Sequence, residues 1–289
     1  MFLRKLSKSI QTSLKTLEIE VCGCVCVSPA AIGEFFKNLE PMLSRITTLE
    51  IDFKGCSLKI FDHPFFTREL SFLENLKLTA NCVLVTNFLK GIQSSRIKKV
   101  AFNFCWNEQI RNKSAEELIV SFLQSHRMTI VSIDLSMQYS NNTTFWLPSN
   151  FNRLVFPQCR AVNFKGVNIL FSPIIPLLND LLRSESVEYI SLDSDILPYI
   201  FNQQQICNAR NIRVINHDEN LYPRLDLKVL VAKFPYWQKL YVKNFDLTSC
   251  IVLKNPRGVI RLEGISNLDH EKLNELLLVA KNTDILFVI

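Results

Sequence analysis

The chain contains 289 residues, of which 48% are hydrophobic and 21% charged, and this balance excludes an intrinsically disordered protein. The formal net charge of +6 is spread thinly, without the Lys/Arg run that marks a nucleic-acid or membrane patch. With seven glycines and no P-loop, G-x-G-x-x-G or H-E-x-x-H sequence, the chain lacks the signatures of phosphate-cradling loops and zinc proteases.

A short apolar phrase, Leu-x-x-Leu-x-Leu with Ile, Val or Phe substituting, recurs along almost the whole chain, beginning with Leu14-x-x-Leu17-x-Ile19. The central residues of the later copies are, in chain order, Leu49, Leu76, Val100, Ile133, Val162, Ile190, Ile212 and Leu240, with two further copies near Ile260–Leu262 and Ile285–Phe287. Successive copies are about 20 to 33 residues apart, which is a solenoid-like period. Alternation within each copy predicts a short strand with one buried face.

Amphipathic helices are predicted between these strands. The helix-start signals are, in chain order, Ser28-Pro29, the capping box of Ser114 with Glu117, Ser172-Pro173, Asp226 and Asp269. Each provides an N-cap side chain, with or without a proline at the first helical position, before apolar residues at helical spacing. The longest insertion, residues 137–157, is expected to fold back onto the edge of the solenoid.

Strands and helices therefore alternate, and neither can bury its apolar side alone. Stacking of successive units supplies the core, and the crossovers between parallel strands are expected to be right-handed. We predict an α/β solenoid with a curved parallel sheet inside and helices outside. Residues 1–289 are expected to form a single domain of about ten to eleven irregular repeats.

This pattern resembles leucine-rich repeat proteins of the long, helix-containing type. Within that class it is most similar to the repeat region of divergent, nematode-like F-box/leucine-rich-repeat proteins, over roughly residues 10–289. In that family an Asn or Cys three residues past the last apolar residue of the phrase bonds the backbone of the turn. Cys22, Asn81 and Cys105 match this position, but most other repeats do not, so an irregular horseshoe is expected.

The resemblance also implies a function. In such proteins an F-box recruits a ubiquitin ligase core and the repeats bind a substrate, so the implied partners are a ligase adaptor and a substrate protein. No F-box is found here, because the first repeat begins near Leu14 and leaves no room for one. Loss of the F-box, a fragment of a longer chain and another branch of the family all remain open.

The cysteines and the lack of targeting segments bear on location. The nine cysteines are an odd number, and the N-terminal residues lack an apolar signal-peptide core, which favours reduced thiols in the cytoplasm or nucleus. No window of about 18 apolar residues exists, so no membrane span is predicted.

Two local patterns suggest reactive chemistry. Cys22-x-Cys24-x-Cys26 would place three thiols on one face of an extended segment, where thiolates could bind a metal, although small buried residues at a repeat turn are the preferred interpretation. Asp269-His270-Glu271 is interpreted as a helix cap rather than a metal cluster. The four histidines lie in different repeats with no Cys or Ser paired to them by sequence. We therefore predict a non-enzymatic protein without a catalytic residue, metal or cofactor.

The candidate binding surface is the outward side of the strands. In each phrase, the residue between the second and third apolar positions, and the residue two positions later, must point away from the core. This stripe is acidic at its N-terminal end and mixed or basic at its C-terminal end. The predicted protein-binding residues in it are Glu18, Glu50, Asp52, Asp134, Asp193, Arg213, Tyr241 and Lys243. Arg213 and Tyr241 are the expected anchors, because Arg and Tyr are enriched among interface hot spots.

The resulting hypothesis is a non-enzymatic scaffold that binds a partner protein along the concave strand face. A structural scaffold that self-associates through its apolar C-terminal strand is the first alternative. A Cys-based or metal-dependent enzyme at Cys22–Cys26 is the second. Nucleic-acid binding, motivated only by the net charge of +6, is the third and is not expected.

Overall fold

A computed structural model of the chain supports a description of most of the repeat strands and of the C-terminal half. The described residues are 14–20, 34, 37, 39, 43, 45–52, 70–81, 89, 92, 94–106, 121–139, 155–165, 174–202, 206–249, 258–280 and 284–288. The chain divides into two compact units, Met1–Leu154 and Val155–Ile289. Each unit is described below by itself.

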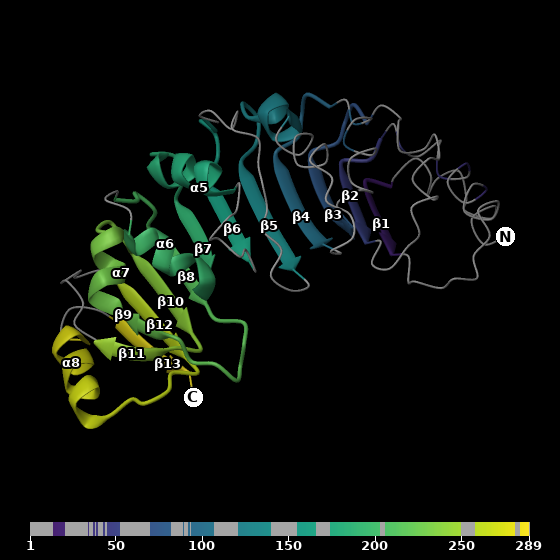
Figure 1. Ribbon diagram of the computed structural model, residues 1–289. Helices are drawn as coiled ribbons and strands as arrows, with labels where there is room; N and C mark the ends of the chain where they lie inside the picture. The colour runs from purple at the N-terminus through teal and green to yellow at the C-terminus, as the bar shows by residue number, and fades with distance from the viewer. Residues whose placement is uncertain are drawn as a thin grey trace. The chain divides into compact units, whose positions relative to one another are not determined.

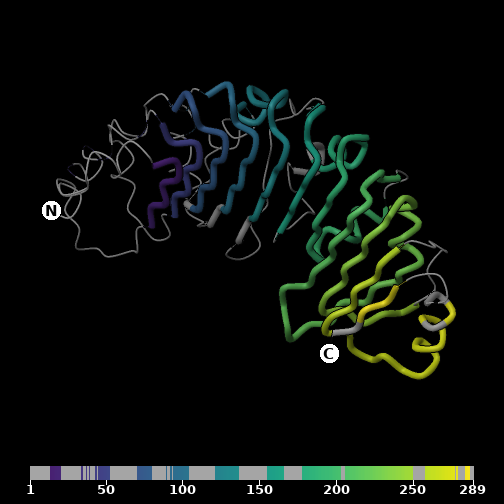
Figure 2. The backbone as a smooth tube through the Cα atoms, turned by 180° about the vertical axis from the view of Figure 1, so that it is seen from behind, coloured from purple at the N-terminus to yellow at the C-terminus, as the bar shows by residue number. Residues whose placement is uncertain are grey.

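The described residues of the first unit form five strands that pair in sequence order, and every pair is parallel. These strands are β1 (Thr16–Glu20), β2 (Thr48–Asp52), β3 (Asn75–Asn81), β4 (Lys99–Trp106) and β5 (Ser132–Tyr139). Figure 1 shows them side by side, and Figure 2 shows the same order from behind. The register aligns the predicted central residues in one row, which runs Leu17, Leu49, Leu76, Val100, Ile133. The parallel, in-register stacking of these strands is thus confirmed.

The described residues of the second unit form six parallel strands in sequence order together with a small second sheet. The six strands are β6 (Ala161–Lys165), β7 (Tyr189–Asp193), β8 (Asn211–Ile215), β10 (Lys239–Lys243), β12 (Val259–Glu263) and β13 (Asp284–Val288). The second sheet pairs β9 (Arg224–Asp226) with β11 (Asp246–Ser249), also in parallel. The helical segments of this unit are α5 (Ile174–Arg183), the 3-10 turn η5 (Ser194–Ile196), α6 (Leu197–Asn202), α7 (Leu227–Lys233) and α8 (His270–Ala280).

A recurring pair of backbone hydrogen bonds fixes the register from strand to strand. Two successive N–H groups donate to one carbonyl oxygen just before the preceding strand, as Thr47 and Thr48 do to Lys15 at 2.9 and 3.0 Å. The same arrangement recurs at β3, β4 and β5 in the first unit and at β7, β8 and β10 in the second. A carbonyl oxygen has two lone pairs and can accept both bonds. Each strand is therefore placed directly against its neighbour without a shift.

The core of each unit lies on one side of its strands. Alternate strand residues are buried, and Ile133 in the first unit and Ile190 and Ile260 in the second have no exposed surface. In the second unit Leu178, Leu181 and Leu182 of α5 are buried as well. An apolar strand face and an apolar helix face thus bury one another, as the alternating sequence pattern predicts.

Three of the predicted helices begin where expected. α5 follows Ser172-Pro173, and Asp226 caps α7 by accepting hydrogen bonds from Lys228 N at 2.8 Å and Val229 N at 3.3 Å. Asp269 accepts one from Lys272 N at 2.9 Å at the start of α8, which confirms the helix-cap interpretation of Asp269-His270-Glu271. The predicted start signals at residues 28–29 and 114–117, and residues 140–154 of the expected insertion, lie outside the described residues.

The observed architecture is an α/β fold built from parallel strands, with few helices among the described residues. This confirms the coarse fold class, whereas the leucine-rich repeat type and the single domain over residues 1–289 stay predictions. Within the described parts of the chain, no helix is long and apolar enough to cross a bilayer.

Candidate functional site

Strand register in the second unit gathers the candidate residues into rows. Arg213 on β8 is paired with Tyr241 on β10, and Tyr241 is paired with Arg261 on β12. The flanking residues of the same strands, such as Leu240 and Val242, are buried. Side chains alternate across a strand, so Arg213, Tyr241 and Arg261 emerge side by side on the face opposite the core. The predicted anchors Arg213 and Tyr241 are therefore brought together by the structure.

The half-buried Tyr241 ring lies between two guanidinium groups. The guanidinium carbons of Arg213 and Arg261 are each 5.2 Å from the ring centroid. Because the two arginines come from the strands on opposite sides of β10, the ring has a cation on each side. A cation over an aromatic face at an exposed site contributes about 0.5–1 kcal/mol. The stack therefore holds three long side chains in one arrangement.

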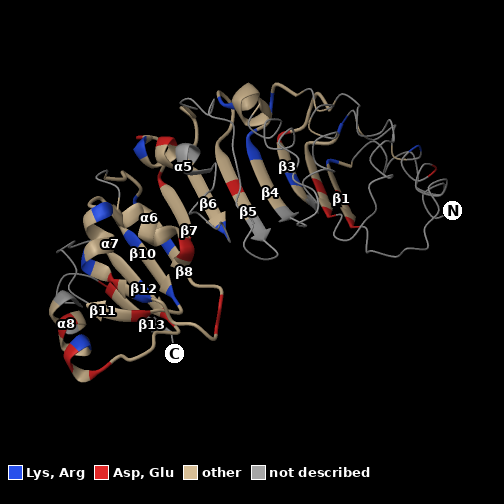
Figure 3. Ribbon diagram, viewed as in Figure 1, with Lys and Arg blue, Asp and Glu red and all other residues tan. Residues whose placement is uncertain are grey.

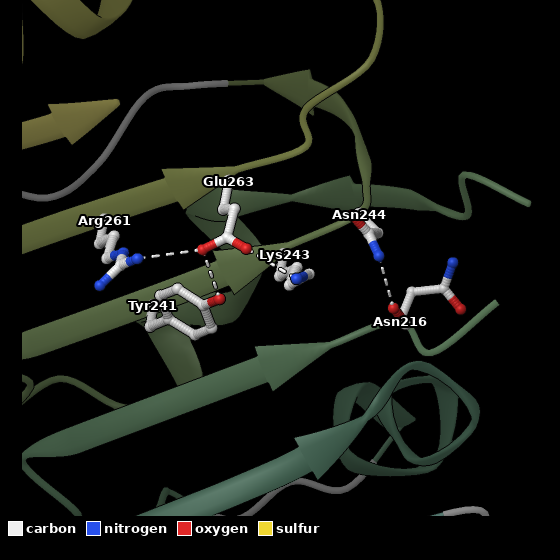
Figure 4. Close-up of polar contacts among 6 residues, drawn as sticks. All are labelled: Asn216, Tyr241, Lys243, Asn244, Arg261 and Glu263. Carbon is white, nitrogen blue, oxygen red and sulfur yellow. Dashed lines mark hydrogen bonds and ion pairs between the residues drawn. The ribbon is translucent and has the colours of Figure 1, made fainter. Parts of the chain in front are cut away.

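Glu263 on β12 bonds side chains from two rows of outward residues, the row of Tyr241 and Arg261 and the row that contains Lys243. Its Oε2 accepts a hydrogen bond from the Tyr241 hydroxyl at 2.8 Å and from Arg261 Nη2 at 3.2 Å, and its Oε1 accepts one from Lys243 Nζ at 2.7 Å (Figure 4). These donors lower the pKa of Glu263, with Lys243 the largest cause. The bond to Glu263 raises the pKa of Lys243, while burial and then the same carboxylate raise the pKa of Tyr241. We call Arg213, Tyr241, Lys243, Arg261 and Glu263 the Tyr241 cluster.

The turns that follow these strands are tied together as well. The Asn216 N–H donates to Lys243 O at 3.0 Å, and the Asn244 N–H donates to Glu263 O at 2.9 Å. The Asn244 side-chain amide also donates to Asn216 O at 3.0 Å (Figure 4). Asn244 and Gly264 both have positive φ, 60° and 57°. Because these turns are bonded to one another, they fix the strand ends that carry Lys243 and Glu263.

Asp193, another predicted binding residue, lies in a cavity rather than on the open face. Its side chain is only 7% exposed and accepts a hydrogen bond from the Ser194 hydroxyl at 3.1 Å. The cavity of about 610 Å³ is also lined by Asp195, Asn216 and Tyr222. Burial and then the charge of Asp193 raise the pKa of the Asp195 carboxyl. Asp193, at the end of β7, is therefore buried instead of being exposed on the outward side of the strands.

Three of the predicted acidic residues of the first unit, Glu18, Glu50 and Asp52, lie on its N-terminal strands β1 and β2. Glu18 pairs with Glu50 in the register, and Asp52 lies at the end of the same β2 strand. Lys77 of β3 donates to Glu50 Oε2 at 2.8 Å, and this bond is the main cause of the raised pKa of Lys77. Asp134 lies farther along the sheet, on β5, paired with an alanine of β4. Figure 3 shows acidic residues on β1 and basic residues on β10 and β12.

The described residues offer no metal-binding cluster, and the buried His126, Cys159 and Cys207 have structural surroundings. None of them forms a group of three or more His, Cys, Asp or Glu that could hold a metal ion. His126 is buried, with its Nδ1 2.8 Å from Phe122 O and its ring packed on Phe122. Burial raises the thiol pKa of Cys159 to about 12 and that of Cys207 to about 11, so both thiols stay protonated at neutral pH. The Cys22–Cys26 segment lies outside the described residues.

Sequence reasoning missed two members of the Tyr241 cluster, Arg261 and Glu263. The signal was available, because the phrase around Ile260–Leu262 places both residues at outward positions of the strand. What the sequence alone does not show is that Glu263 bonds two residues of the neighbouring strand. That depends on the unshifted pairing of β10 with β12.

Comparison with known proteins adds no assignment: no protein-family model matches the chain, and no curated protein matches it significantly.

Proposed function

We propose that the chain is a non-enzymatic protein-interaction scaffold of the leucine-rich repeat type, which binds a partner on the outward face of its parallel strands. The observation that carries this proposal is the Tyr241 cluster, in which one tyrosine is held between two arginines on three adjacent strands. Tyr and Arg are the residue types that most often dominate interface energetics.

Preorganisation supports the same proposal. Long side chains normally lose conformational entropy when a partner immobilises them, at about 0.5–1.5 kcal/mol each. In the Tyr241 cluster much of this entropy is already lost on folding, since Glu263 bonds Tyr241, Lys243 and Arg261 in the absence of a partner. The cluster also rests on strands rather than on a loop, which holds its geometry more precisely.

Affinity capture from a lysate of cells that express the protein tests the proposal. Three baits are compared: the natural chain, Tyr241→Ala, and Tyr236→Ala as a control at a tyrosine that is 62% exposed and lies outside the cluster. We expect proteins retained by the natural chain and by Tyr236→Ala to be lost by Tyr241→Ala, and to rebind in purified form with the same dependence. Equal capture by all three baits would contradict a binding role for this face.

The role of substrate receptor in ubiquitin ligation is the more specific form of this proposal, and its support is the resemblance described above. Its test is a pull-down with the full-length gene product, probed for a ligase adaptor. Failure to recover an adaptor would remove the ligase role and leave the binding face to be judged by the capture experiment.

A structural, self-associating scaffold is a second candidate function, favoured by one observation. β13 pairs with β12 on one side, and among the described residues no strand pairs with its other side. Leu286 on this strand is 52% exposed. An open strand edge can pair with a second copy. Sedimentation velocity over a range of concentrations tests it, and a strictly monomeric profile would count against it.

A further inference from the structure

The charges of the Tyr241 cluster point to the chemistry of its partner. We propose that the cluster binds an acidic segment of the partner protein, with partner carboxylates on Arg213 and Arg261. This inference rests on the proposed function, because it names the kind of partner that the same face would recognise. It goes further in committing the site to carboxylate side chains presented in an extended segment.

Cations outnumber carboxylates on the outward side of β8, β10 and β12. These three strands present Arg213, Lys239, Lys243 and Arg261 against a single carboxylate, that of Glu263. Glu263 is already engaged by Lys243, Arg261 and the Tyr241 hydroxyl. The next carboxylates lie around these strands: Asp193 of β7 pairs with Ile215 of β8, Glu219 interacts electrostatically with Lys243, and Asp284 pairs with Val259 at the far edge. The centre of the face therefore remains positive.

Among the described residues neither Arg213 nor Lys239 has a carboxylate partner, and Arg213 is the one that belongs to the Tyr241 cluster. Within the described part of the chain, no Asp or Glu oxygen lies within 4.0 Å of its guanidinium, whose recorded contact is the Tyr241 ring. A guanidinium has five N–H donors in a plane and accepts a carboxylate bidentately. With one flat side on the ring, Arg213 is oriented and still has its edge free for such a ligand. Arg261 has further donors besides the one that bonds Glu263.

The spacing of the two arginines sets the spacing of the ligand carboxylates. Arg213 and Arg261 lie on strands separated by one strand, which places their backbones roughly 9–10 Å apart. In an extended peptide, residues two or three positions apart are separated by about 7–10 Å. A segment crossing the strands with acidic residues at such intervals could therefore contact both guanidiniums at once, over the edge of the Tyr241 ring.

The same geometry disfavours a nucleic acid as the occupant. Binding of single-stranded nucleic acid relies on aromatic faces on which bases stack. In the Tyr241 cluster the ring already has two guanidiniums, each 5.2 Å from its centroid, so it is engaged by cations of its own sheet and is not an open platform for a base.

Fluorescence anisotropy with defined peptides tests the inference. The probe is a labelled twelve-residue peptide in which Glu alternates with Gly, and its matched neutral control replaces every Glu by Gln. The proteins are the natural chain, Arg213→Gln, and Lys228→Gln, which removes the same charge from an exposed position on α7. We expect the Glu peptide to bind the natural chain and Lys228→Gln alike, and Arg213→Gln at least tenfold more weakly. The Gln peptide should not bind.

Equal binding of the Glu and Gln peptides, equal loss in the two variants, or no loss in Arg213→Gln would each overturn the inference, as would failure of the Glu peptide to bind at all. Circular dichroism of each variant confirms that folding is unchanged. The capture experiment distinguishes a failure of the acidic-ligand proposal from a failure of the proposed function. If Tyr241→Ala still loses partners while the peptide result is negative, the binding face stands and its acidic ligand is wrong. If Tyr241→Ala loses nothing, the proposed function itself fails.

Discussion

At the residue scale, Glu263 holds the side chains of the Tyr241 cluster in place. Three donors from two strands converge on its carboxylate: Lys243, the Tyr241 hydroxyl and Arg261. Without that carboxylate the three donors would keep their positions in the register but lose the group that draws them together. The side chain thus acts as a positioning group for the Tyr241 cluster, and its ionisation controls the arrangement.

This gives a pH-dependent prediction for Glu263→Gln. Because the pKa of Glu263 is lowered in the folded chain from its ordinary value of 4.5, its ionised form stabilises the fold above pH 4.5. That stabilisation is lost as the pH falls through the folded-state pKa. We expect the free energy of unfolding of the natural chain to exceed that of the variant by no more than about 1 kcal/mol at pH 7, since solvent screens the pairs.

Urea unfolding at a series of pH values measures this difference, which should shrink below pH 4.5. Glu185→Gln, at an exposed position outside the cluster, serves as the control and should show a flat profile. A Glu263 difference that does not change between pH 7 and pH 3 would show that the carboxylate charge is not what stabilises the cluster.

At the element scale, the turns after β8, β10 and β12 explain how the strand ends stay aligned. Asn216 and Asn244 are both buried, and each turn donates a backbone N–H to the end of the next strand. At β12 the equivalent position is Gly264, whose φ of 57° is one that side chains with a Cβ rarely adopt. At the equivalent position of the three turns, the first two have asparagine, Asn216 and Asn244, and the third has Gly264.

Gly264→Ala is therefore expected to be destabilising. A Cβ at this position would lie 2.3 Å from Asn244 Oδ1, and the Asn244 amide is held by its bond to Asn216 O. Steric conflict and the positive φ together should lower the free energy of unfolding by more than about 1 kcal/mol. Chemical denaturation measures the loss.

The Asn244→Gly background is the control, because glycine tolerates the positive φ of 60° and removes the clashing amide. In that background Gly264→Ala should cost less than in the natural chain. Equal costs in the two backgrounds would mean that contact with Asn244 does not determine the need for glycine.

Local chemistry explains which elements could be predicted from the sequence. Asp226 and Asp269 cap helices by bonding backbone groups two or three residues away, so the signal and the structure lie in one stretch of sequence. By contrast, α6 is six residues long and the sheet of β9 and β11 has three- and four-residue strands. Elements this short gain their stability from tertiary contacts, and they are too short to show a periodic pattern of apolar residues in the sequence.

The turn asparagines show a different limit of sequence reasoning. The family pattern places the turn-bonding residue three positions past the last apolar residue of the phrase, whereas Asn216 and Asn244 lie two positions past Val214 and Val242. A search at the family position therefore misses them. In the candidate site, alternation predicted that Arg213 and Tyr241 would point outward, and the pairing of β8 with β10 makes them neighbours. The bonds of Glu263 required three-dimensional positions, because long side chains choose among several partners.

At the scale of the whole molecule, the buried core and the proposed binding surface lie on opposite faces of the same strands. The inward residues form rows of buried aliphatic side chains, and the outward residues form rows of charged ones. In the first unit the outward positions of β1 and β2 hold Glu18, Glu20, Glu50 and Asp52, whereas in the second unit β8, β10 and β12 hold mainly cations. Each unit thus offers a charged face without weakening its interior.

This division predicts that the two faces respond differently to substitution. Ile190 has no exposed surface and lies between Val162 and Ile212 in the register. Ile190→Ala should lower the free energy of unfolding by about 2–5 kcal/mol, because it leaves a cavity in a continuous row. Arg213→Ala, on the outward face of the adjacent strand, should change it by no more than about 0.5 kcal/mol while abolishing capture of the partner.

Urea denaturation followed by circular dichroism gives the first quantity, and the lysate capture gives the second. The informative comparison is the pair of variants rather than either alone, since a scaffold that merely unfolds also loses its partner. If Arg213→Ala proved as destabilising as Ile190→Ala, the arginine would belong to the structural framework and its loss of binding would say nothing about recognition. Retained stability together with lost capture would instead place the binding energy on the outward row, because charge on that row can change without disturbing the core beneath it.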